Sequence, residues 1–356
     1  MPLWKPTDVE GAYDSSTTCS MWVRPESLPV NATCTIWQND ADTSTNLTAA
    51  VKSGGTRVPQ TSDGAVKNGY TGASYHTDKE SYFTSSASSS TIGDVGYGCF
   101  LFYCYLENET VNASSSVVPA NVNQFIFAND ALTSSNALST RAANRGVWHS
   151  TKDGAGGTHY TRSNLSDNFQ GATTANLTIN AKTGNVTGGV WTYDSAQTSG
   201  TGPLTTFVGC ARTIAADGTN QKVQTYFAGA ALAESTASSG SINMNDSGAF
   251  ILGNDNGFDE SIRGSMFEAC MIHMGSTFHE DIRDRMEGYL AWKYDDLLPD
   301  SDEAGTGGSV HTYKQGPPTT CHCVAGSTLS TTKLTSNPVI PYTLKEPLNV
   351  YDRNRR

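Results

Sequence analysis

Charged residues are scarce in this chain, and basic residues are scarcer than acidic ones. Only 16% of its 356 residues are charged, and 23 Lys and Arg against 34 Asp and Glu give a net charge of −11. Binding to nucleic-acid phosphates requires clustered Lys and Arg, so this balance argues against a nucleic-acid partner. Ser, Thr, Gly, Asn and Ala are abundant instead, which is typical of extracellular all-β proteins and viral coat components rather than of cytosolic helical enzymes.

Long apolar runs are also absent. The longest, Cys99 to Leu106, is far shorter than the roughly 20 residues of a membrane helix and fits a buried strand, so we expect no membrane insertion. The first ten residues, MPLWKPTDVE, lack the basic start and apolar core of a secretory signal. We therefore expect a protein that is made in a cytoplasm and assembled there into a particle, although a mature secreted protein without its signal would have the same composition.

The sequence lacks the common catalytic and cofactor motifs. It has no Gly-x-Ser-x-Gly, no His-Glu-x-x-His, no phosphate-binding loop and no Gly-x-Gly-x-x-Gly. We therefore expect no enzymatic activity and no resident cofactor. Asn254, Asp255, Asn256 and Asp259 offer oxygen ligands that Ca²⁺ would favour. An Asx-rich hairpin turn needs the same residues, so the calcium site and the turn are alternatives.

The eight cysteines do not have the spacing of a small disulfide-bonded domain. We expect most of them to be free, buried thiols. The tripeptide Cys321-His322-Cys323 has the form of a zinc-site fragment, but tetrahedral zinc needs two further ligands and no second Cys or His pair lies nearby in the sequence. The remaining cysteines are Cys19, Cys34, Cys99, Cys104, Cys210 and Cys270.

Short apolar segments with a period of two, separated by Gly, Asn, Asp and Ser, predict an all-β sandwich or barrel. Two strand-like segments near the N-terminus carry Trp22 and Trp37, and Asp217 to Asn220 predicts a hairpin turn between two later strands. The other predicted strands span residues 98–106, 123–128, 146–149, 176–179, 190–193, 205–213, 222–228, 249–253 and 262–273.

One long segment, residues 277–298, has the periodicity of an amphipathic helix. Its apolar stripe consists of Ile282, Met286, Tyr289 and Leu290, and Lys293 recurs at the same spacing. Thr277 and Glu280 have the spacing of a capping box. Pro299 follows the segment and cannot continue a helix, so we expect the helix to span residues 277–298.

The helix sequence from Met286 to Tyr294 resembles the EGYLA-K-W closing helix of concanavalin A-like (laminin-G-like) jelly-roll domains, which are frequent in structural proteins of bacteriophages, marine ones especially. The pairs Leu298-Pro299, Tyr313-Lys314 and Pro317-Pro318 follow in the order found in that family, and residues 262–273 resemble its last long strand. Trp22, Trp37, Asn39 and Asp40 match the family's N-terminal pattern, but its W-L-D-A-S-D motif is replaced by residues 22–27.

This resemblance implies an antiparallel two-sheet jelly-roll sandwich. We expect a leader at residues 1–20, a sandwich at residues 21–298 that includes the closing helix 277–298, and an extended arm at residues 299–356. The function it implies is that of a virion structural protein, specifically a homo-oligomeric capsid decoration or knob protein of a phage that presents a lectin-like domain. The partners would be the major capsid protein or tail proteins.

The arm has two readings, because a segment so rich in Gly, Ser, Thr and Pro cannot fold alone. It is either a floppy tail or an arm that becomes ordered only against neighbouring subunits, and we expect the second. Apolar side chains would anchor it to a partner. These anchors are Val339, Ile340, Tyr342, Leu344 and Tyr351.

Two alternative functions remain. The first is a tail fibre or adhesin module that binds a host surface glycan, because sugars stack on exposed aromatic rings beside polar groups. The second is a glycan-cleaving enzyme. Glucanases that share this fold carry an alternating Glu-x-Asp-x-Glu pattern, which is absent here: Glu268 is the only acid on its predicted strand. We interpret Glu287 as a surface residue of the helix or as a hydrogen-bonding group of the fold. The sugar-binding candidates are Trp148, His149, Tyr160, Trp191 and Tyr193.

Overall fold

The structure is a computed structural model, and all of its described residues fall within the unit Met1–His322. The side chains of most residues between 122 and 236 are not described, although their strands are. The predicted arm anchors Val339, Ile340, Tyr342, Leu344 and Tyr351 lie outside the described residues. The described residues are 3–51, 55, 57–75, 81–85, 92, 98–108, 122–129, 145–152, 158–165, 173–178, 186–187, 190–191, 200–201, 204–214, 221–227, 229–236, 249–254, 262, 264–296, 298 and 311–320.

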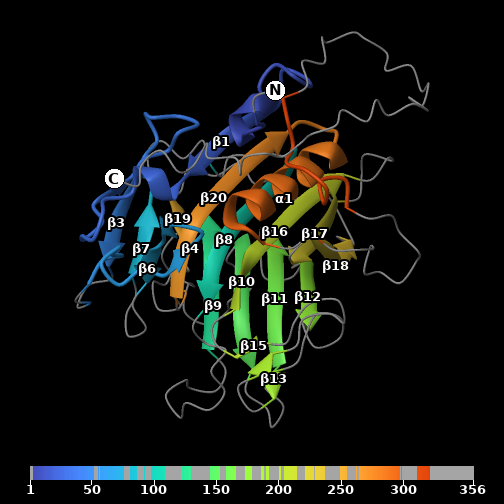
Figure 1. The fold of residues 1–356 in the computed structure, drawn as a ribbon. Coiled ribbons are helices and arrows are strands. Elements are labelled where there is room, and N and C mark those ends of the chain that lie inside the picture. Colours follow the sequence, from blue (N-terminus) through green and yellow to red (C-terminus); the bar gives the residue numbers. More distant parts are fainter. Residues whose placement is uncertain are drawn as a thin grey trace, which may run out of the picture. The chain divides into compact units, whose positions relative to one another are not determined.

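Two antiparallel sheets form the body of the unit (Figure 1). The first has seven strands in the order β1-β20-β8-β16-β17-β18, with β6 also paired to β20. The apolar run predicted as a buried strand is β8, at the centre of this sheet. The bounds are β1 Thr17–Val23, β6 Ala73–Tyr75, β8 Cys99–Asn108, β16 Leu204–Ile214, β17 Gln221–Phe227, β18 Ala230–Thr236 and β20 Gly264–Met274.

The second sheet has eight strands in the order β12-β11-β10-β9-β19-β7-β3-β2. Two small separate sheets, β13-β14-β15 and β4-β5, make up the rest of the described strands. The bounds are β2 Ile36–Trp37, β3 Leu47–Val51, β7 Ser81–Thr84, β9 Val122–Asn129, β10 Arg145–Lys152, β11 Thr158–Leu165, β12 Thr173–Thr178 and β19 Phe250–Leu252. Those of the small sheets are β4 Val66–Lys67, β5 Tyr70–Thr71, β13 Val186–Thr187, β14 Val190–Trp191 and β15 Gly200–Thr201.

The first sheet is buried on both faces, which explains why its central strand is apolar throughout. Side chains alternate across a strand, so Phe100 and Phe102 of β8 face a core shared with the second sheet, where Phe127 and Phe250 also lie. Leu101, Tyr103 and Tyr105 of the same strand face a second core beneath the helix. The chain is therefore an antiparallel all-β sandwich with a helix on the outer face of one sheet, and the predicted fold class is confirmed at this level.

The helix α1 spans Glu280–Tyr294, which is shorter at both ends than the predicted 277–298. The N-cap residue is His279, and no side chain caps it, so the capping box expected from Thr277 and Glu280 does not form. At the other end Asp295 adopts a left-handed conformation with φ 53°, and the Asp296 N–H donates to the Ala291 carbonyl at 2.8 Å. Aspartate tolerates this conformation, so the helix ends before Pro299 is reached.

The boundaries of the sandwich also differ from those expected. The leader contributes to the sandwich, because Trp4 and Val9 are buried in the core between the first sheet and the helix. Residues 311–320, assigned by sequence to the arm, return to the same place: the Trp4 N–H donates to the Pro318 carbonyl at 2.9 Å, and Leu3 pairs with Thr319. Residues 3–9 and 311–320 therefore pack together on the helix side of the first sheet.

The residues that match the family's N-terminal pattern are structural. Asn39 is buried, and its side-chain oxygen accepts the Trp22 N–H at 2.8 Å while its amide donates to the Ser20 carbonyl and the Thr45 hydroxyl, both at 3.0 Å. The Trp37 indole donates to the Arg24 carbonyl at 2.8 Å. These bonds fix the connection between β1 and β2. The 3₁₀ turns η1 Pro6–Val9 and η2 Pro25–Ser27 flank β1.

The cysteine and hairpin predictions agree with the structure where it describes them. The six cysteines from Cys19 to Cys270 are buried thiols that the structure does not join in disulfides, and burial raises the pKa of the Cys34 thiol to about 12. Cys321 and Cys323 lie outside the described residues. Strands β16 and β17 pair as an antiparallel hairpin around the predicted turn. Within the described part of the chain, no helix has the length and apolarity needed to cross a bilayer.

Gly288 marks the point where the 311–320 segment crosses α1. A Cβ added there would lie 2.6 Å from the Tyr313 Cβ, so Gly288→Ala must displace the segment. We expect it to lower the free energy of unfolding by about 1–3 kcal/mol, although alanine favours a helix by about 1 kcal/mol over glycine. Urea denaturation measures the change. Gly316→Ala is the matched control, since its Cβ would meet nothing within 4 Å; equal midpoints for the two variants would contradict the prediction.

Candidate functional site

Glu268, on strand β20, is a fully buried carboxylate beneath α1. Its Oε1 accepts the Trp22 indole N–H at 2.6 Å and the Tyr289 hydroxyl at 2.8 Å. Its Oε2 accepts the Lys293 ammonium at 2.7 Å and the Tyr294 hydroxyl at 2.8 Å. A carboxylate has about four lone-pair sites, so these four donors occupy the whole group.

The surroundings keep the two tyrosines of this network protonated. Burial, and then the charge of Glu268, raises the pKa of both Tyr289 and Tyr294 well above the usual value, so both remain hydrogen-bond donors. The Lys293 side chain is only 4% exposed and has a second carboxylate partner, the half-exposed Glu26, at 3.1 Å. The four donors therefore leave Glu268 without a free lone pair with which to take part in a reaction.

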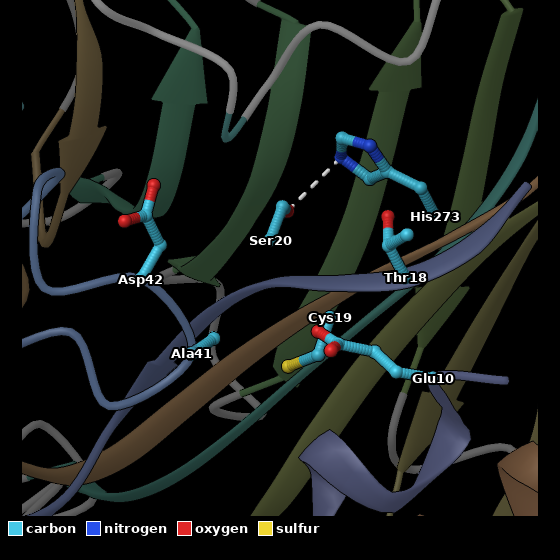
Figure 2. A pocket seen from close by; sticks show the side chains of 7 residues that line it. All are labelled: Glu10, Thr18, Cys19, Ser20, Ala41, Asp42 and His273. Carbon is cyan, nitrogen blue, oxygen red and sulfur yellow. Dashed lines mark hydrogen bonds between the residues drawn. The ribbon is translucent and has the colours of Figure 1, made fainter.

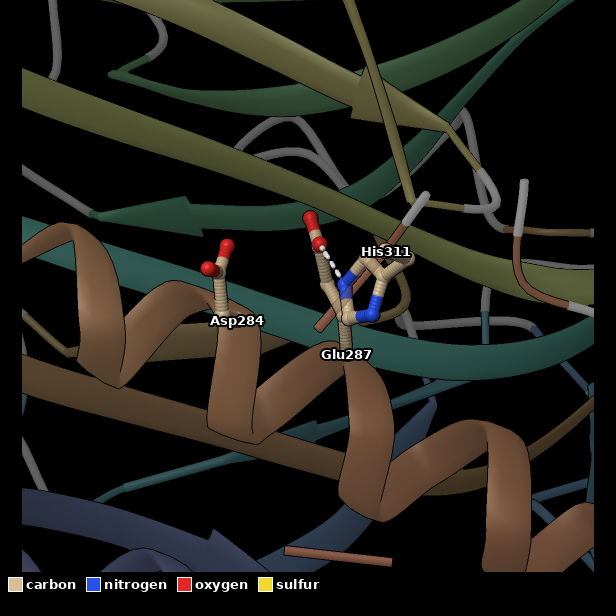
Figure 3. A group of neighbouring side chains, drawn as sticks. All are labelled: Asp284, Glu287 and His311. Atoms are coloured by element: carbon tan, nitrogen blue, oxygen red, sulfur yellow. Dashed lines mark hydrogen bonds and ion pairs between the residues drawn. The ribbon is translucent and has the colours of Figure 1, made fainter. Parts of the chain in front are cut away.

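A second buried carboxylate, Glu287, lies on α1 and points the other way, toward the sheet and the C-terminal segment. Its Oε1 accepts the Tyr103 hydroxyl of β8, and its Oε2 pairs with His311 Nε2 at 3.0 Å. Figure 3 shows Asp284, one turn earlier on the helix, beside this pair. Of the two readings of Glu287 from sequence, a surface residue and a hydrogen-bonding group of the fold, the structure confirms the second.

Asp284, Glu287 and His311 place their ligand atoms within 4.8 Å of one another, the spacing of a metal site. The hydrogen bonds argue against that use. The Tyr313 backbone N–H donates to His311 Nδ1 at 3.2 Å, so the proton of a neutral imidazole resides on Nε2, the atom that would have to bind the metal. The Arg283 guanidinium also lies 2.6 Å from the Asp284 carboxylate and neutralises it. We call these three residues the latch, because the His311–Glu287 pair holds residues 311–320 on the helix.

One pocket described by the structure is an open cleft of about 330 Å³ beside β1. Figure 2 shows the side chains around it, which come from β1, the 41–42 turn, the end of β20 and the N-terminal segment. Among the lining residues that are described there is no Trp, Tyr or Phe ring on which a sugar could stack. The lining residues are Glu10, Thr18, Cys19, Ser20, Ala41, Asp42 and His273.

The cleft contains a serine beside a histidine, but the pair is not arranged for nucleophilic catalysis. Ser20 Oγ lies 3.0 Å from His273 Nε2. The same Nε2 lies 2.8 Å from the Ile92 carbonyl, which can only accept, so Nε2 carries a proton and cannot take one from Ser20 as a general base must. Ser20 Oγ also bonds to the Ile92 carbonyl at 3.2 Å. These bonds connect Ile92 to β1 and β20.

The predicted sugar-binding residues fall on different strands, and their side chains are not among those described. In the β10–β11 ladder Trp148 lies opposite Arg162, and Tyr160 lies opposite Ser150. Because residues 148 and 150 are two apart on β10, Trp148 and Tyr160 occupy positions of the same parity in the ladder. His149, opposite Thr161, has the other parity, so it does not share a sheet face with Trp148. Trp191 belongs to the separate sheet β13-β14-β15, and Tyr193 is outside the described residues.

The predicted calcium site is described only at its first residue. Asn254 is buried and follows β19, directly after Gly253, which has a φ of 89°. Asp255, Asn256 and Asp259 lie outside the described residues, so the calcium site and the Asx turn remain alternatives.

Comparisons with known proteins give a distant structural likeness. No family model and no curated protein matches the chain. Among solved structures it is similar to domain 4 of AbnA, a GH43 extracellular arabinanase from Geobacillus stearothermophilus, in complex with arabinotriose, with a TM-score of 0.37 and 11% identity. The likeness covers 76% of this chain and 98% of that one.

Replacing Glu268 tests whether its network supports the fold. Glu268→Ala removes the main partner of Lys293 and leaves that charge buried, so we expect a loss of about 3–5 kcal/mol of unfolding free energy, measured by chemical denaturation. Glu26→Gln is the control, because Glu26 is half-exposed and contributes about 1 kcal/mol or less. A loss below about 1 kcal/mol for Glu268→Ala would show that the network is dispensable.

Metal titration distinguishes the latch from a metal site at Asp284, Glu287 and His311. A metal that binds only the folded protein raises its melting temperature. We expect the melting temperature to be the same in excess EDTA and in excess Zn²⁺. A rise with Zn²⁺ that disappears in His311→Gln would establish a metal site instead.

Proposed function

We propose that this chain is a non-catalytic structural protein of a virus particle, a capsid decoration protein in which a jelly-roll sandwich is displayed on an arm that docks on the shell. One observation carries the proposal: the two ends of the described chain meet. Leu3 pairs with Thr319, and the Trp4 N–H bonds to the Pro318 carbonyl. A module whose two ends leave from one place can be anchored there and present the rest of its surface.

The bonds of the C-terminal segment suit this role. Arg285 donates to the Thr319 carbonyl at 2.9 Å, the Trp292 indole donates to the Tyr313 carbonyl at 2.7 Å, and Lys314 donates to the Leu298 carbonyl at 3.0 Å. Together with the His311–Glu287 pair, they hold the segment from which residues 321–356 continue. A docked arm would therefore transmit load to α1 and the first sheet rather than to a loose connection.

The chemistry of the described residues supports a role without catalysis. Glycosidases need two carboxyl groups about 5–9.5 Å apart on either side of the sugar. Glu268 and Glu287, the fully buried carboxylates among the described residues, are both occupied by structural donors. The helix resemblance and the low charge of the chain add support for a virion component, and a homo-oligomer fits a repeated shell site.

Sedimentation with purified empty shells tests the proposal. Full-length protein should co-sediment, and a variant ending at Thr320 should not, because it keeps the latch but lacks the arm. Ile340→Ser/Tyr342→Ser is the matched variant: the chain keeps its length and loses two apolar anchors, so we expect weaker binding. Equal binding by the full-length and truncated proteins, or binding by neither, would contradict the proposal.

A second candidate, a tail-fibre or adhesin module that binds host glycan, is favoured by the shared parity of Trp148 and Tyr160 on neighbouring strands. If the chain binds a glycan through this sheet face, Trp148→Ala should abolish binding on a glycan array, and His149→Ala, at a position of the other parity, should preserve it. The absence of binding both with and without Ca²⁺ would remove this candidate.

A further inference from the structure

Two cysteines lie side by side on the first two strands of the seven-stranded sheet. Cys19 of β1 and Cys270 of β20 have their Sγ atoms 3.8 Å apart, whereas the sulfurs of a disulfide are about 2.05 Å apart. Cys19 lies opposite Ile272, two residues from Cys270, and the register of β1 shifts at the next residue, Ser20. Both side chains belong to the core beneath α1.

The two thiols differ in their position relative to the cleft. Cys19 is 4% exposed and is one of the residues that line the cleft, although Figure 2 shows its sulfur on the other side of the β1 ribbon from Thr18 and Ser20. Cys270 is 1% exposed and is not among the lining residues. A cleft of about 330 Å³ is far larger than a peroxide molecule, so a small oxidant can enter it and approach Cys19 before Cys270.

We propose that Cys19 and Cys270 form a redox-modifiable pair, which hydrogen peroxide converts into a disulfide that links β1 to β20. In the first step the Cys19 sulfur attacks peroxide: an S–O bond forms, the O–O bond breaks, and sulfenic acid and one water result. In the second step the Cys270 sulfur attacks the Cys19 sulfur, the S–O bond breaks, and a second water leaves. Two thiols lose two electrons, and peroxide gains them.

The order of the two steps follows from the surroundings. Burial, and then the hydrogen bond with Cys19, raises the pKa of Cys270 well above the usual value, so Cys270 is the less reactive of the two thiols toward peroxide. Cys19, which lines the cleft, is therefore oxidised first. Cys270 then attacks the sulfenic acid across the 3.8 Å between the two sulfurs, and its proton leaves with the hydroxyl as water.

The chain contains an internal comparison for this proposal. Cys104 lies opposite Val208, two residues from Cys210, so these two cysteines have the same diagonal relation across β8 and β16. Both are fully buried in the core between the two sheets, and neither lines the cleft. If access through the cleft decides reactivity, this second pair should stay reduced under conditions that oxidise the first.

Peptide mapping after oxidation tests the proposal on the full chain carrying Cys321→Ser and Cys323→Ser, so that only the described cysteines remain. The folded protein is treated with hydrogen peroxide, quenched with catalase, alkylated in denaturant and digested for mass spectrometry. We expect a peptide pair linked through Cys19 and Cys270, the loss of two free thiols per chain, and reduced Cys104 and Cys210. Cys19→Ser should abolish the link, and Cys104→Ser should preserve it.

Three results would overturn the proposal. The first is an unmodified Cys19 after peroxide treatment. The second is a Cys19 that accumulates only sulfinic or sulfonic acid, which would show that Cys270 cannot resolve the sulfenic acid. The third is a Cys104–Cys210 link that forms as fast as the Cys19–Cys270 link, which would show that oxidation proceeds through unfolding rather than through the cleft.

Discussion

The burial of Glu268 between strand β20 and helix α1 is the interaction on which the rest of this structure depends. A carboxylate without water is costly, and only a close set of donors offsets that cost. Here Tyr289, Lys293 and Tyr294 supply three of the four donors from one face of the helix, and Trp22 of β1 supplies the fourth. A slip or rotation of the helix would break several of these bonds together, so the network fixes one position of α1 on the sheet.

A reciprocal contact completes the arrangement. Glu287 extends from the helix to Tyr103 of the sheet and to His311 of the returning segment, so the same helix holds both the sheet and the last described part of the chain. The buried polar groups on this side of the molecule therefore serve the fold. Leu3 and Thr319 pair on this side of the molecule. This pairing of the two ends of the described chain is the physical basis for proposing a displayed module with an anchored arm.

The sequence predicted the elements better than the polar contacts. The apolar run of β8 predicts a strand buried on both faces, and Ile282, Met286 and Leu290 predict the buried side of α1. Lys293 recurs in that stripe, and Glu268 is a lone acid in an apolar strand, so the sequence carries a signal for an ion pair. The pairing of these two residues depends on how the helix is positioned along the sheet, which periodicity does not encode. Residues 311–320 have no periodicity, and only tertiary contacts hold them.

Native-state hydrogen exchange tests the central claim most directly, because it measures the free energy at which each element opens. If the Glu268 and Glu287 networks make the helix integral to the sandwich, the central amides of α1 exchange with the same free energy as those of β8 and β20, through global unfolding. Exchange of α1 at a much lower free energy than β8 and β20 would contradict the account, since the helix would then open alone while the sheets stayed folded.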